Sequence, residues 1–389
     1  MIVVVGAGLI GLSIAYELSK RNADVRVIEA REPGRAASWA GAGMLAPYTE
    51  NVVPSAFEDL CVAALHAYPS FARELQACSG VDAHLRLDGI VEAAFDRDQA
   101  ARLDAHVAAL EVRSVPARRL TRDEVRALEP ALGPSVVSGA FTPSEGAVDN
   151  RRLGRALHAA CLARGVRIDE RAGEIAIEAD TRRVLGVRTS NGFVPARAVV
   201  NAAGAWAGML AGVPDHARVA VVPSKGQMLA LAMPRGLVCH VMWAPGAYLV
   251  PRDDGRLLVG ATVEDAGFDV RVTARGLGTL LDAALSALPA LGNLAVAETW
   301  AGIRPGTPDG LPYLGESSLS GYVVATGHYR NGILLAPVTA QAIADILEGR
   351  SRPDLAPFSP QRAEGRPAAG LPRAAESEET YAAIAKESA

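Results

Sequence analysis

Apolar residues in the first thirty positions follow two different spacings. Residues 2–5 form an unbroken apolar run rich in valine, which predicts a buried strand, and apolar residues then recur at helical spacing up to Lys20. A second apolar run at residues 25–28 predicts another strand, which closes at Glu29. The pattern therefore predicts one complete strand–helix–strand unit at the start of the chain.

Helical spacing of apolar residues returns in several longer stretches, and Thr121 followed by Glu124 has the pattern of a capping box at the start of a further helix. The longer expected helices cover residues 56–79, 98–111, 150–164, 272–288 and 333–348. Shorter apolar runs predict strands, and the turn Asp253–Gly255 predicts a hairpin. The expected strands cover residues 85–87, 90–95, 166–168, 173–177, 184–189, 219–222, 227–232, 238–242, 247–252, 256–261 and 321–327. Residues 198–207 predict an apolar strand that ends in small residues and a new helix.

The order of these elements predicts an α/β fold with two domains. One is a doubly wound dinucleotide-binding domain that is discontinuous in sequence, and the other is a substrate domain built on an antiparallel sheet. We assign residues 1–84, 146–217 and 300–360 to the first domain, and residues 85–145 and 218–299 to the second. Residues 365–389 are rich in Pro, Ala and Glu, which predicts a flexible tail, with a short helical pattern at 381–386.

Three glycines follow the first strand in the order Gly6-Ala7-Gly8-Leu9-Ile10-Gly11. The first lets the chain turn out of the strand, the second lets backbone N–H groups approach a pyrophosphate, and the third lets the helix pack on the sheet. Phosphates would then lie at the positive N-terminus of the helix. Glu29 follows Gly11 by 18 residues, where its carboxylate can accept hydrogen bonds from a ribose and would repel an adenosine phosphate, which disfavours NADP. This unit alone leaves open NAD, FAD, or a turn that binds nothing.

Small residues are frequent at positions 31–45, directly after the second strand. Such a run either turns freely as a linker or brings backbone very close to another group. Beside a dinucleotide-binding strand we favour the second interpretation, in which the Ser38 hydroxyl and the N–H groups around Gly43 meet a phosphate or a ring.

Composition and charge exclude several classes of function. The 389 residues are 50% hydrophobic and 21% charged, which is ordinary for a globular protein with ample core for two or three domains. The formal net charge is −4 and basic residues do not cluster, so we expect no nucleic-acid partner. No apolar run has the length of a membrane span. The N-terminus lacks the basic residues of a signal peptide, so we interpret it as core and expect a cytoplasmic protein.

The cysteines give no sign of a metal or a redox site. Four are present, they lie far apart, and no two form a CxxC pair. We therefore expect reduced thiols and no bound metal. The four are Cys61, Cys78, Cys161 and Cys239.

Several motifs, taken together in this order, resemble the FAD-dependent D-amino-acid oxidase family, and within it the glycine oxidase branch that belongs to thiamine biosynthesis. The resemblance covers roughly residues 1–360. The motifs that carry it are Gly6–Gly11 with Glu29, Ala37-Ser38, Ala42-Gly43-Met44-Leu45, Asn201–Trp206, Tyr248–Thr262, Trp300–Thr307 and Gly327-His-Tyr-Arg-Asn-Gly332.

This resemblance implies an FAD that extends across the doubly wound domain and reaches the antiparallel sheet with its isoalloxazine. It implies hydride transfer from the α-carbon of an amino acid to the flavin, hydrolysis of the imine to an oxo acid and ammonia, and reoxidation by molecular oxygen with release of hydrogen peroxide. The protein supplies orientation and no base. None of the four cysteines lies beyond Cys239, so the flavin is expected to be non-covalent.

The resemblance also implies the site residues. Arg304 would bind the substrate carboxylate and Tyr248 would be its second contact, although a structural salt bridge and plain packing remain open for these two. Arg330 matches a position near substrate and flavin. His328 is more consistent with a structural role than with a general base.

The loop at 328–334 precedes an expected helix, so its N–H groups can hydrogen-bond the carbonyl oxygens of the flavin. The full set of expected FAD contacts is Gly6, Gly8, Leu9, Ile10, Gly11, Glu29, Ala30, Ala37, Ser38, Ala42, Gly43, Met44, Glu174, His328, Tyr329, Arg330, Asn331, Gly332, Ile333 and Leu334.

One departure affects the expected substrate. Val263 stands where a methionine is expected in this branch, so a larger amine could fit. We expect an oxidase of glycine, with sarcosine and small D-amino acids as further candidates. The alternatives are a dehydrogenase of the same fold that passes electrons to a quinone or carrier protein, and a flavoprotein module or pyridine-nucleotide reductase, which would need a second glycine fingerprint. Family habit implies a homo-oligomer, with a tetramer suspected.

Overall fold

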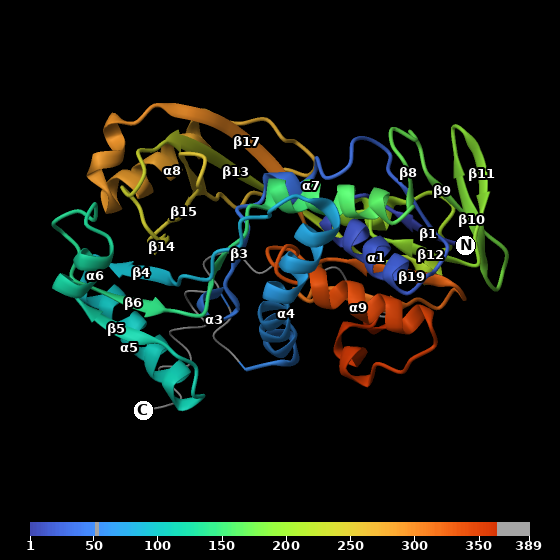
Figure 1. Ribbon diagram of the computed structural model, residues 1–389, viewed down its shortest axis with the longest axis horizontal. Coiled ribbons are helices and arrows are strands. Elements are labelled where there is room, and N and C mark those ends of the chain that lie inside the picture. The colour runs from blue at the N-terminus through green and yellow to red at the C-terminus, as the bar shows by residue number, and fades with distance from the viewer. Residues whose placement is uncertain (51–53, 364–389) are drawn as a thin grey trace.

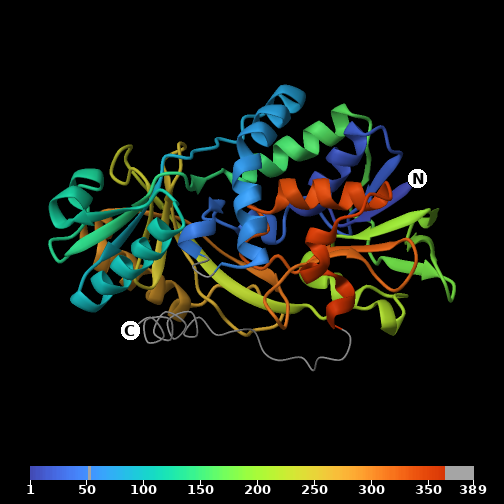
Figure 2. The same ribbon diagram turned by 90° about the horizontal axis from the view of Figure 1, so that it is seen from below.

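The structure, a computed structural model, describes residues 1–50 and 54–363. Two large sheets lie toward opposite ends of its long axis, and helix α4 (Ala56–Ser79) lies between them (Figures 1 and 2). The expected tail at 365–389, with the helical pattern at 381–386, lies outside the described residues.

The first sheet has six strands in the order β18-β19-β12-β1-β2-β8. All neighbours are parallel except β18, which is antiparallel to β19. In chain order the strands are β1 (Ile2–Val5), β2 (Val25–Ile28), β8 (Arg167–Asp169), β12 (Ala198–Asn201), β18 (Tyr313–Glu316) and β19 (Tyr322–Thr326).

Both faces of this sheet are buried, which explains why its strands are continuous apolar runs. Val4 and Val200 face the helices α1 (Leu9–Lys20), α4, α7 (Asn150–Ala163) and α9 (Ala336–Leu347). Val3 and Val199 face the other way, into a core shared with a small three-stranded sheet. That sheet consists of β9 (Ala176–Ala179), β10 (Val184–Thr189) and β11 (Gly192–Pro195).

The second sheet has eight strands in the order β17-β13-β16-β15-β14-β4-β6-β5. Its neighbours are antiparallel, except that β14 and β4 are parallel. In chain order they are β4 (Ile90–Ala94), β5 (Arg118–Thr121), β6 (Ser138–Thr142), β13 (Val222–Ala232), β14 (Val241–Ala244), β15 (Ala247–Pro251), β16 (Arg256–Gly260) and β17 (Val296–Gly306). Three helices accompany this sheet: α5 (Arg97–Val112), α6 (Arg122–Leu128) and α8 (Ala274–Ala287).

Short elements join the two sheets and complete the chain. A two-stranded pair, β3 (Met44–Leu45) with β7 (Gly146–Ala147), lies close to the junction of the sheets. The remaining short elements are α2 (Ala37–Ala40), α3 (Pro47–Glu50), η1 (Gly204–Met209), η2 (Asp215–Ala217), η3 (Pro289–Asn293), η4 (Pro353–Phe358) and η5 (Pro360–Ala363).

The predicted fold class is confirmed, and most expected helices begin and end within two residues of their predicted bounds. Thr121 and Glu124 form the predicted capping box at α6. The hairpin at Asp253–Gly255 joins β15 to antiparallel β16 as predicted.

Other expectations about elements were wrong. Residues 85–87 form no strand and contribute only an isolated bridge at Arg86. The run at 219–222 is not a strand of its own, because β13 begins at Val222. The last helix begins at Ala336, not at residue 333, because Pro337 lies in its first turn, where a missing N–H costs no helical hydrogen bond.

The proposed domain division places a boundary between residues 299 and 300, which lies inside β17. This strand pairs with β13 along almost its whole length, from Val296 to Gly306. The division into two domains therefore stays a proposal. Among the described residues, no helix is both long and apolar enough to cross a membrane.

Candidate cofactor and substrate site

The glycine turn between β1 and α1 is shaped by close backbone approaches. Gly6 has a φ of +102°, and a Cβ there would lie 2.5 Å from the Ala202 carbonyl oxygen. A Cβ on Gly11 would lie 1.9 Å from the carbonyl oxygen of Gly6. Side chains at these two positions would therefore prevent the helix from starting directly at the end of the strand.

The N-terminus of α1 presents backbone donors. Its N-cap residue, Gly8, has no side chain to cap the helix, and the N–H of Leu9 donates to the Ser38 hydroxyl oxygen at 2.9 Å. Within the described part of the chain, the N–H groups of Gly8, Ile10 and Gly11 have no hydrogen-bond acceptor. Such unpaired donors at the positive end of a helix dipole fit a phosphate group.

Glu29 lies at the end of β2 and contacts the same glycine turn. One carboxylate oxygen accepts from the Ala7 N–H at 2.7 Å, and the other accepts from the Arg31 N–H at 2.9 Å. Each oxygen keeps a lone pair that could accept a ribose hydroxyl. Ala30 lies beside Glu29, and its carbonyl accepts from Gly173, which places the exposed Glu174 near this strand end.

The small-residue run at 37–45 is fixed in place and is not a free linker. Gly43 has a φ of +74°, and a Cβ there would lie 2.0 Å from the Val148 carbonyl oxygen. Met44 pairs with Ala147 across β3 and β7. The close neighbour that requires glycine at position 43 is therefore the backbone before α7.

Arg252 ties this run to the eight-stranded sheet. Its buried guanidinium donates to the Ala42 carbonyl at 2.7 Å, to the Val148 carbonyl at 3.1 Å and to the Asn150 side-chain oxygen at 3.0 Å. The Asn150 amide donates in turn to the carbonyls of Ser38 and Trp39. Burial lowers the pKa of Arg252 to about 10, so it remains a cation at neutral pH.

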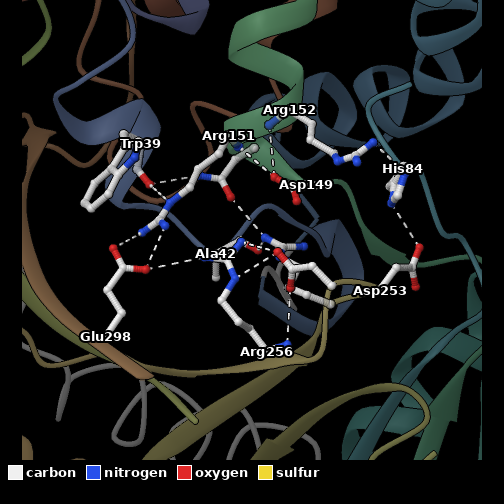
Figure 3. A network of polar contacts seen from close by, with 12 residues as sticks. Trp39, Ala42, His84, Asp149, Arg151, Arg152, Asp253, Arg256 and Glu298 are labelled. Carbon is white, nitrogen blue, oxygen red and sulfur yellow. Dashed lines mark hydrogen bonds and ion pairs between the residues drawn. The ribbon is translucent and has the colours of Figure 1, made fainter. Parts of the chain in front are cut away.

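A second set of contacts runs parallel to the first (Figure 3). Arg151 on α7 forms a fork with Glu298 on β17, with N–O distances of 2.8 and 3.1 Å. Its guanidinium also lies 3.7 Å from the centre of the Trp39 ring, within the range of a cation–π contact. Arg256 on β16 reaches the same Glu298 carboxylate at 3.4 Å. A surface pocket lies beside this network and is lined by residues that include His84, Asp149 and Arg252. None of the predicted substrate contacts lines this pocket.

The 328–334 loop packs against the small-residue run, because a Cβ on Gly41 would lie 2.8 Å from the Ile333 side chain. The carbonyl of Ile333 accepts from the Tyr68 hydroxyl at 2.6 Å. Among the described residues, the N–H groups of Gly332, Ile333 and Leu334 have no acceptor. These donors precede α9, so they could hydrogen-bond the carbonyl oxygens of a ring. Together with the free N–H groups at the start of α1, they provide hydrogen-bond donors for both the phosphates and the ring of a dinucleotide.

His328 and its neighbours have structural contacts. The His328 ring is buried and its Nε2 lies 3.1 Å from the Thr339 hydroxyl, while burial lowers its pKa to about 3. Tyr329 has a φ of +48° and donates its N–H to the Pro305 carbonyl at 2.9 Å. The Asn331 N–H returns to the His328 carbonyl.

The three predicted substrate residues come from two strands of the eight-stranded sheet and from one loop. Arg304 lies on β17, Tyr248 is the second residue of β15, and Arg330 comes from the 328–334 loop; strands β13 and β16 lie between β17 and β15. Burial raises the pKa of the Tyr248 phenol, and the positive charges of Arg304 and Arg330 oppose that shift. The charges of Arg304 and Arg330 thus act on the Tyr248 phenol, although the three residues are separated widely in sequence.

The guanidinium of Arg304 lies flat over Gly226 of β13, because a Cβ there would lie 2.4 Å from Nη1 and 2.6 Å from Cζ. Its Nη1 donates to the carbonyls of Thr262 at 3.1 Å and Lys225 at 3.4 Å. The hydrogen bonds of Arg304 to the carbonyls of described residues involve Nη1 alone, which leaves the edge formed by Nε and Nη2, while a side-chain hydrogen bond from Arg304 helps to lower the pKa of the Tyr248 phenol, which burial raises. That edge carries two parallel N–H groups, the geometry that suits a carboxylate.

A fourth ionisable group at this site, Glu50 at the end of α3, was missed by the sequence analysis. Burial raises the pKa of its carboxyl, and the charges of Arg330 and Arg304 lower it. No motif contains Glu50. It reaches the site because the buried Glu145 carboxylate accepts the N–H groups of Tyr48 and Thr49, which fixes the start of α3.

Arg252 and Asn150 were also missed. A signal existed for Arg252, because it lies in the Tyr248–Thr262 motif, but nothing in the sequence places it against residues 42 and 148. The described residues contain no group of three or more His, Cys, Asp or Glu side chains arranged to hold a metal ion.

Comparison with known proteins gives a consistent result. A model of the family described as FAD dependent oxidoreductase matches residues 1–346. The chain is 39% identical over 368 residues to the bifunctional protein ThiO/ThiG of Synechocystis, covering 93% of this chain and 54% of that protein. The chain therefore spans about half the length of such bifunctional relatives.

Relatives of similar length are also found. The chain is 36% identical to the glycine oxidase of Geobacillus kaustophilus, covering 94% of this chain and 97% of that protein. The crystal structure of that oxidase matches with a TM-score of 0.89 over 94% of this chain and 99% of its own. The chain is 32% identical to the hydrogen cyanide synthase subunit HcnC of Pseudomonas aeruginosa, covering 95% and 97% of the two chains.

Proposed function

Because the chain belongs to the D-amino-acid oxidase family of FAD-dependent oxidoreductases, we propose that it deaminates glycine oxidatively, giving glyoxylate, ammonia and hydrogen peroxide. Relatives named glycine oxidase, 34–36% identical over more than nine-tenths of this chain, support that substrate. Sarcosine and small D-amino acids are further candidates, because Val263 stands at the expected methionine position. The similarity to the ThiO/ThiG proteins supports a role in supplying thiazole synthesis for thiamine. Oxygen as acceptor, a cytoplasmic location and a homotetramer belong to the same proposal.

The residues present fit FAD at both ends of the site. Glu29 would hold the ribose of the adenosine half, the free N–H groups of Gly8, Ile10 and Gly11 would hold the phosphates, and those of residues 332–334 would face the flavin carbonyls. When bound, FAD accepts the hydride that leaves the substrate α-carbon. The chain's own residues bind and orient the amino acid.

The observation that carries the substrate proposal is the open Nε–Nη2 edge of Arg304. A carboxylate on this edge would come within reach of Tyr248, whose phenol stays protonated because burial raises its pKa. Glu50 has the opposite charge to the two arginines when ionised, so it is suited to face an ammonium group. The two arginines and an ionised Glu50 would together match the two charges of an amino acid.

A panel of amines tested with the yellow, FAD-loaded protein for peroxide release examines this function directly. Glycine is expected to give the highest rate. Arg304→Ala should raise the KM for glycine about a hundredfold, since it removes a charge-assisted fork, and should leave FAD content unchanged. Arg188→Ala, on the surface strand β10, is the control. An unchanged KM in Arg304→Ala would refute the carboxylate assignment.

The second candidate is a dehydrogenase that passes its electrons to a quinone or a carrier protein. It is favoured by the similarity to HcnC, which is named as a synthase subunit and not as an oxidase. Under anaerobic conditions, glycine should reduce the flavin and bleach its colour. If the protein is an oxidase, admission of air should restore the yellow colour as soon as the solutions are mixed. A flavin that stays bleached in air and recovers with a quinone analogue would establish the dehydrogenase.

A further inference from the structure

Strand β13, on which the Arg304 guanidinium lies, also has side chains on its opposite face. Side chains alternate between the faces of a strand, so Lys225 and Gln227 of β13 lie opposite Gly226, on the face that does not carry Arg304. Helix α8 packs against β13 on this face (Figure 1). The segment between β16 and α8 covers the end of the strand, because Glu264 bridges to Lys225 through two backbone hydrogen bonds of 3.0 Å.

Gln227 is the buried centre of a polar cluster on that face. Its side chain is fully buried, and its Nε2 donates to the Glu264 carboxylate at 2.7 Å and to the Thr273 hydroxyl at 2.9 Å. Its Oε1 accepts the Thr273 N–H at 2.8 Å. A Cβ on Gly276 would lie 2.4 Å from the Gln227 Nε2, so the first turn of α8 lies directly on this amide.

Glu264 is the charged member of the cluster. The same carboxylate oxygen that accepts from Gln227 also accepts from the Thr262 hydroxyl, and the other oxygen lies 3.4 Å from the buried Lys225 ammonium. Burial opposes ionisation, but hydrogen bonds from Thr262 and Gln227 and the Lys225 charge hold the pKa of Glu264 below its ordinary value. Glu264 is therefore an anion at neutral pH and keeps each of these partners in one geometry.

The cluster and the substrate arginine share two backbone carbonyls. Arg304 donates to the carbonyl oxygens of Thr262 and Lys225, and these are the residues whose side chains Glu264 holds. The Thr262 hydroxyl also accepts the Gln227 N–H at 2.8 Å. A rotation of the 262–264 segment would therefore move the Thr262 carbonyl and break the Glu264 N–H bond to the Lys225 carbonyl, the second acceptor of Arg304.

We propose that Thr262, Glu264 and Gln227 are positioning residues for the substrate carboxylate: from the far face of the sheet they fix the two carbonyls that orient the open edge of Arg304. This inference rests on the proposed function, because it assigns the carboxylate to Arg304. None of the three side chains needs to touch the substrate. They act by restricting the guanidinium to one plane over Gly226.

Acetate is the probe, because it presents a carboxylate without an amine. Its binding to the FAD-loaded enzyme is measured by titration of the visible flavin spectrum. Thr262→Val should weaken acetate binding about tenfold and raise the KM for glycine by a similar factor, with kcat changed less than twofold, because the lost hydroxyl frees the segment. Thr262→Ser, which keeps the hydroxyl, should remain close to the wild type.

Two further variants separate positioning from a general structural role. Thr279→Val on the exposed face of α8 is the matched control and should change neither affinity nor melting temperature. Lys225→Met/Glu264→Leu removes both charges together, so no ion is left buried alone, and should reproduce the loss of acetate affinity. This double variant keeps the inference testable if Thr262→Val fails to fold.

The outcomes distinguish the two levels of the proposal. If Arg304→Ala binds acetate as tightly as the wild type, the proposed function is wrong at this residue and the inference falls with it. If Arg304→Ala loses acetate while Thr262→Val and Lys225→Met/Glu264→Leu keep wild-type affinity, the proposed function stands and the inference is overturned. A fall in FAD content or melting temperature without a change in acetate affinity would also overturn it.

Discussion

At the scale of single residues, carboxylates near the sheets have very different environments. Glu29 at the end of β2 is half-buried and accepts two backbone N–H groups. Glu92 on β4 lies beside the buried His106 ring, with 3.7 Å between Nε2 and one carboxylate oxygen, and that oxygen has no hydrogen-bond partner in the described part of the chain. The first suits a ligand that donates hydroxyl groups, and the second costs stability whenever it ionises.

Glu29→Ala is expected to weaken FAD binding before it affects catalysis. The change removes the acceptor for the ribose and releases the Ala7 N–H that shapes the glycine turn. The dissociation constant for FAD should rise at least tenfold, while kcat at saturating FAD stays within about twofold of wild type. Equilibrium dialysis of the apoprotein gives the affinity. Glu29→Gln keeps one acceptor oxygen, so its affinity for FAD should lie between those of the wild type and Glu29→Ala. Wild-type affinity in Glu29→Ala would contradict the ribose assignment.

Glu92 predicts a pH dependence of stability. Burial raises its pKa to about 7, so between its unfolded value near 4.5 and pH 7 the folded chain holds a proton that the unfolded chain has lost. Stability from this group is therefore present in acid and is lost as pH rises through 7. Glu92→Gln removes the effect and should gain up to about 3 kcal/mol relative to wild type at pH 8, with little difference at pH 4.5.

Melting temperatures of both proteins between pH 4.5 and 8 measure this difference. His106, whose Nε2 lies 3.7 Å from a Glu92 carboxylate oxygen, has its pKa lowered to about 4 by burial and is therefore mostly neutral across this pH range. Parallel melting curves across the pH range would show that Glu92 is not buried as a neutral acid.

At the scale of elements, the junction between the sheets depends on α2 and β3 passing close to other backbone. Gly43 combines a left-handed φ with a Val148 carbonyl only 2.0 Å from where a Cβ would be. Gly34 has a similar φ of +70° and nothing within 4 Å of that position. A side chain at Gly34 would therefore meet only the strain of a positive φ, whereas one at Gly43 would also collide with the Val148 carbonyl.

Gly43→Ala is expected to displace the 37–45 segment and to lower both FAD content and stability. Gly34→Ala should cost only the strain of its φ, about 1 kcal/mol, and should retain FAD. Absorbance of the purified proteins at the flavin band and their melting temperatures give both quantities. Equal FAD content in the two variants would show that the 37–45 segment does not contact the cofactor.

At the scale of the whole molecule, the parts predicted from sequence are those whose pattern is local. The first βαβ unit, the amphipathic helix α4 and the hairpin at Asp253–Gly255 each lie within a short stretch of chain, so spacing alone identifies them. Arg304, Tyr248 and Arg330 were identified only through the resemblance of their motifs to a family.

The remainder depends on pairing between distant segments, which periodicity does not specify. The parallel pairing of β4 with β14 and the position of Glu50 beside two arginines have no local signal. The same holds for Arg252, which joins residues 42, 148 and 150 to the second sheet.

Arg252→Met is expected to loosen the junction of the two sheets. It leaves two carbonyls and the Asn150 oxygen without their buried donor, so the free energy of unfolding should fall by about 2–4 kcal/mol and FAD should dissociate faster. Calorimetry of the FAD-loaded protein and stopped-flow release of FAD measure these effects. Arg252→Lys retains the charge and should be milder. A melting temperature equal to wild type would show that the junction does not depend on this residue.

The hydrogen bonds around the two ends of the site differ in how much chain they enclose. Those that shape the phosphate end join residues 22 and 29 positions apart, from Ala7 to Glu29 and from Leu9 to Ser38. Those that hold Arg304 and the 37–45 segment join residues 79 and 210 positions apart. Short loops close at a lower entropic cost and form faster. The contacts around the glycine turn are thus expected to form while the ribosome is still making the first quarter of the protein. The contacts around Arg304 can form only after β17 has been synthesised.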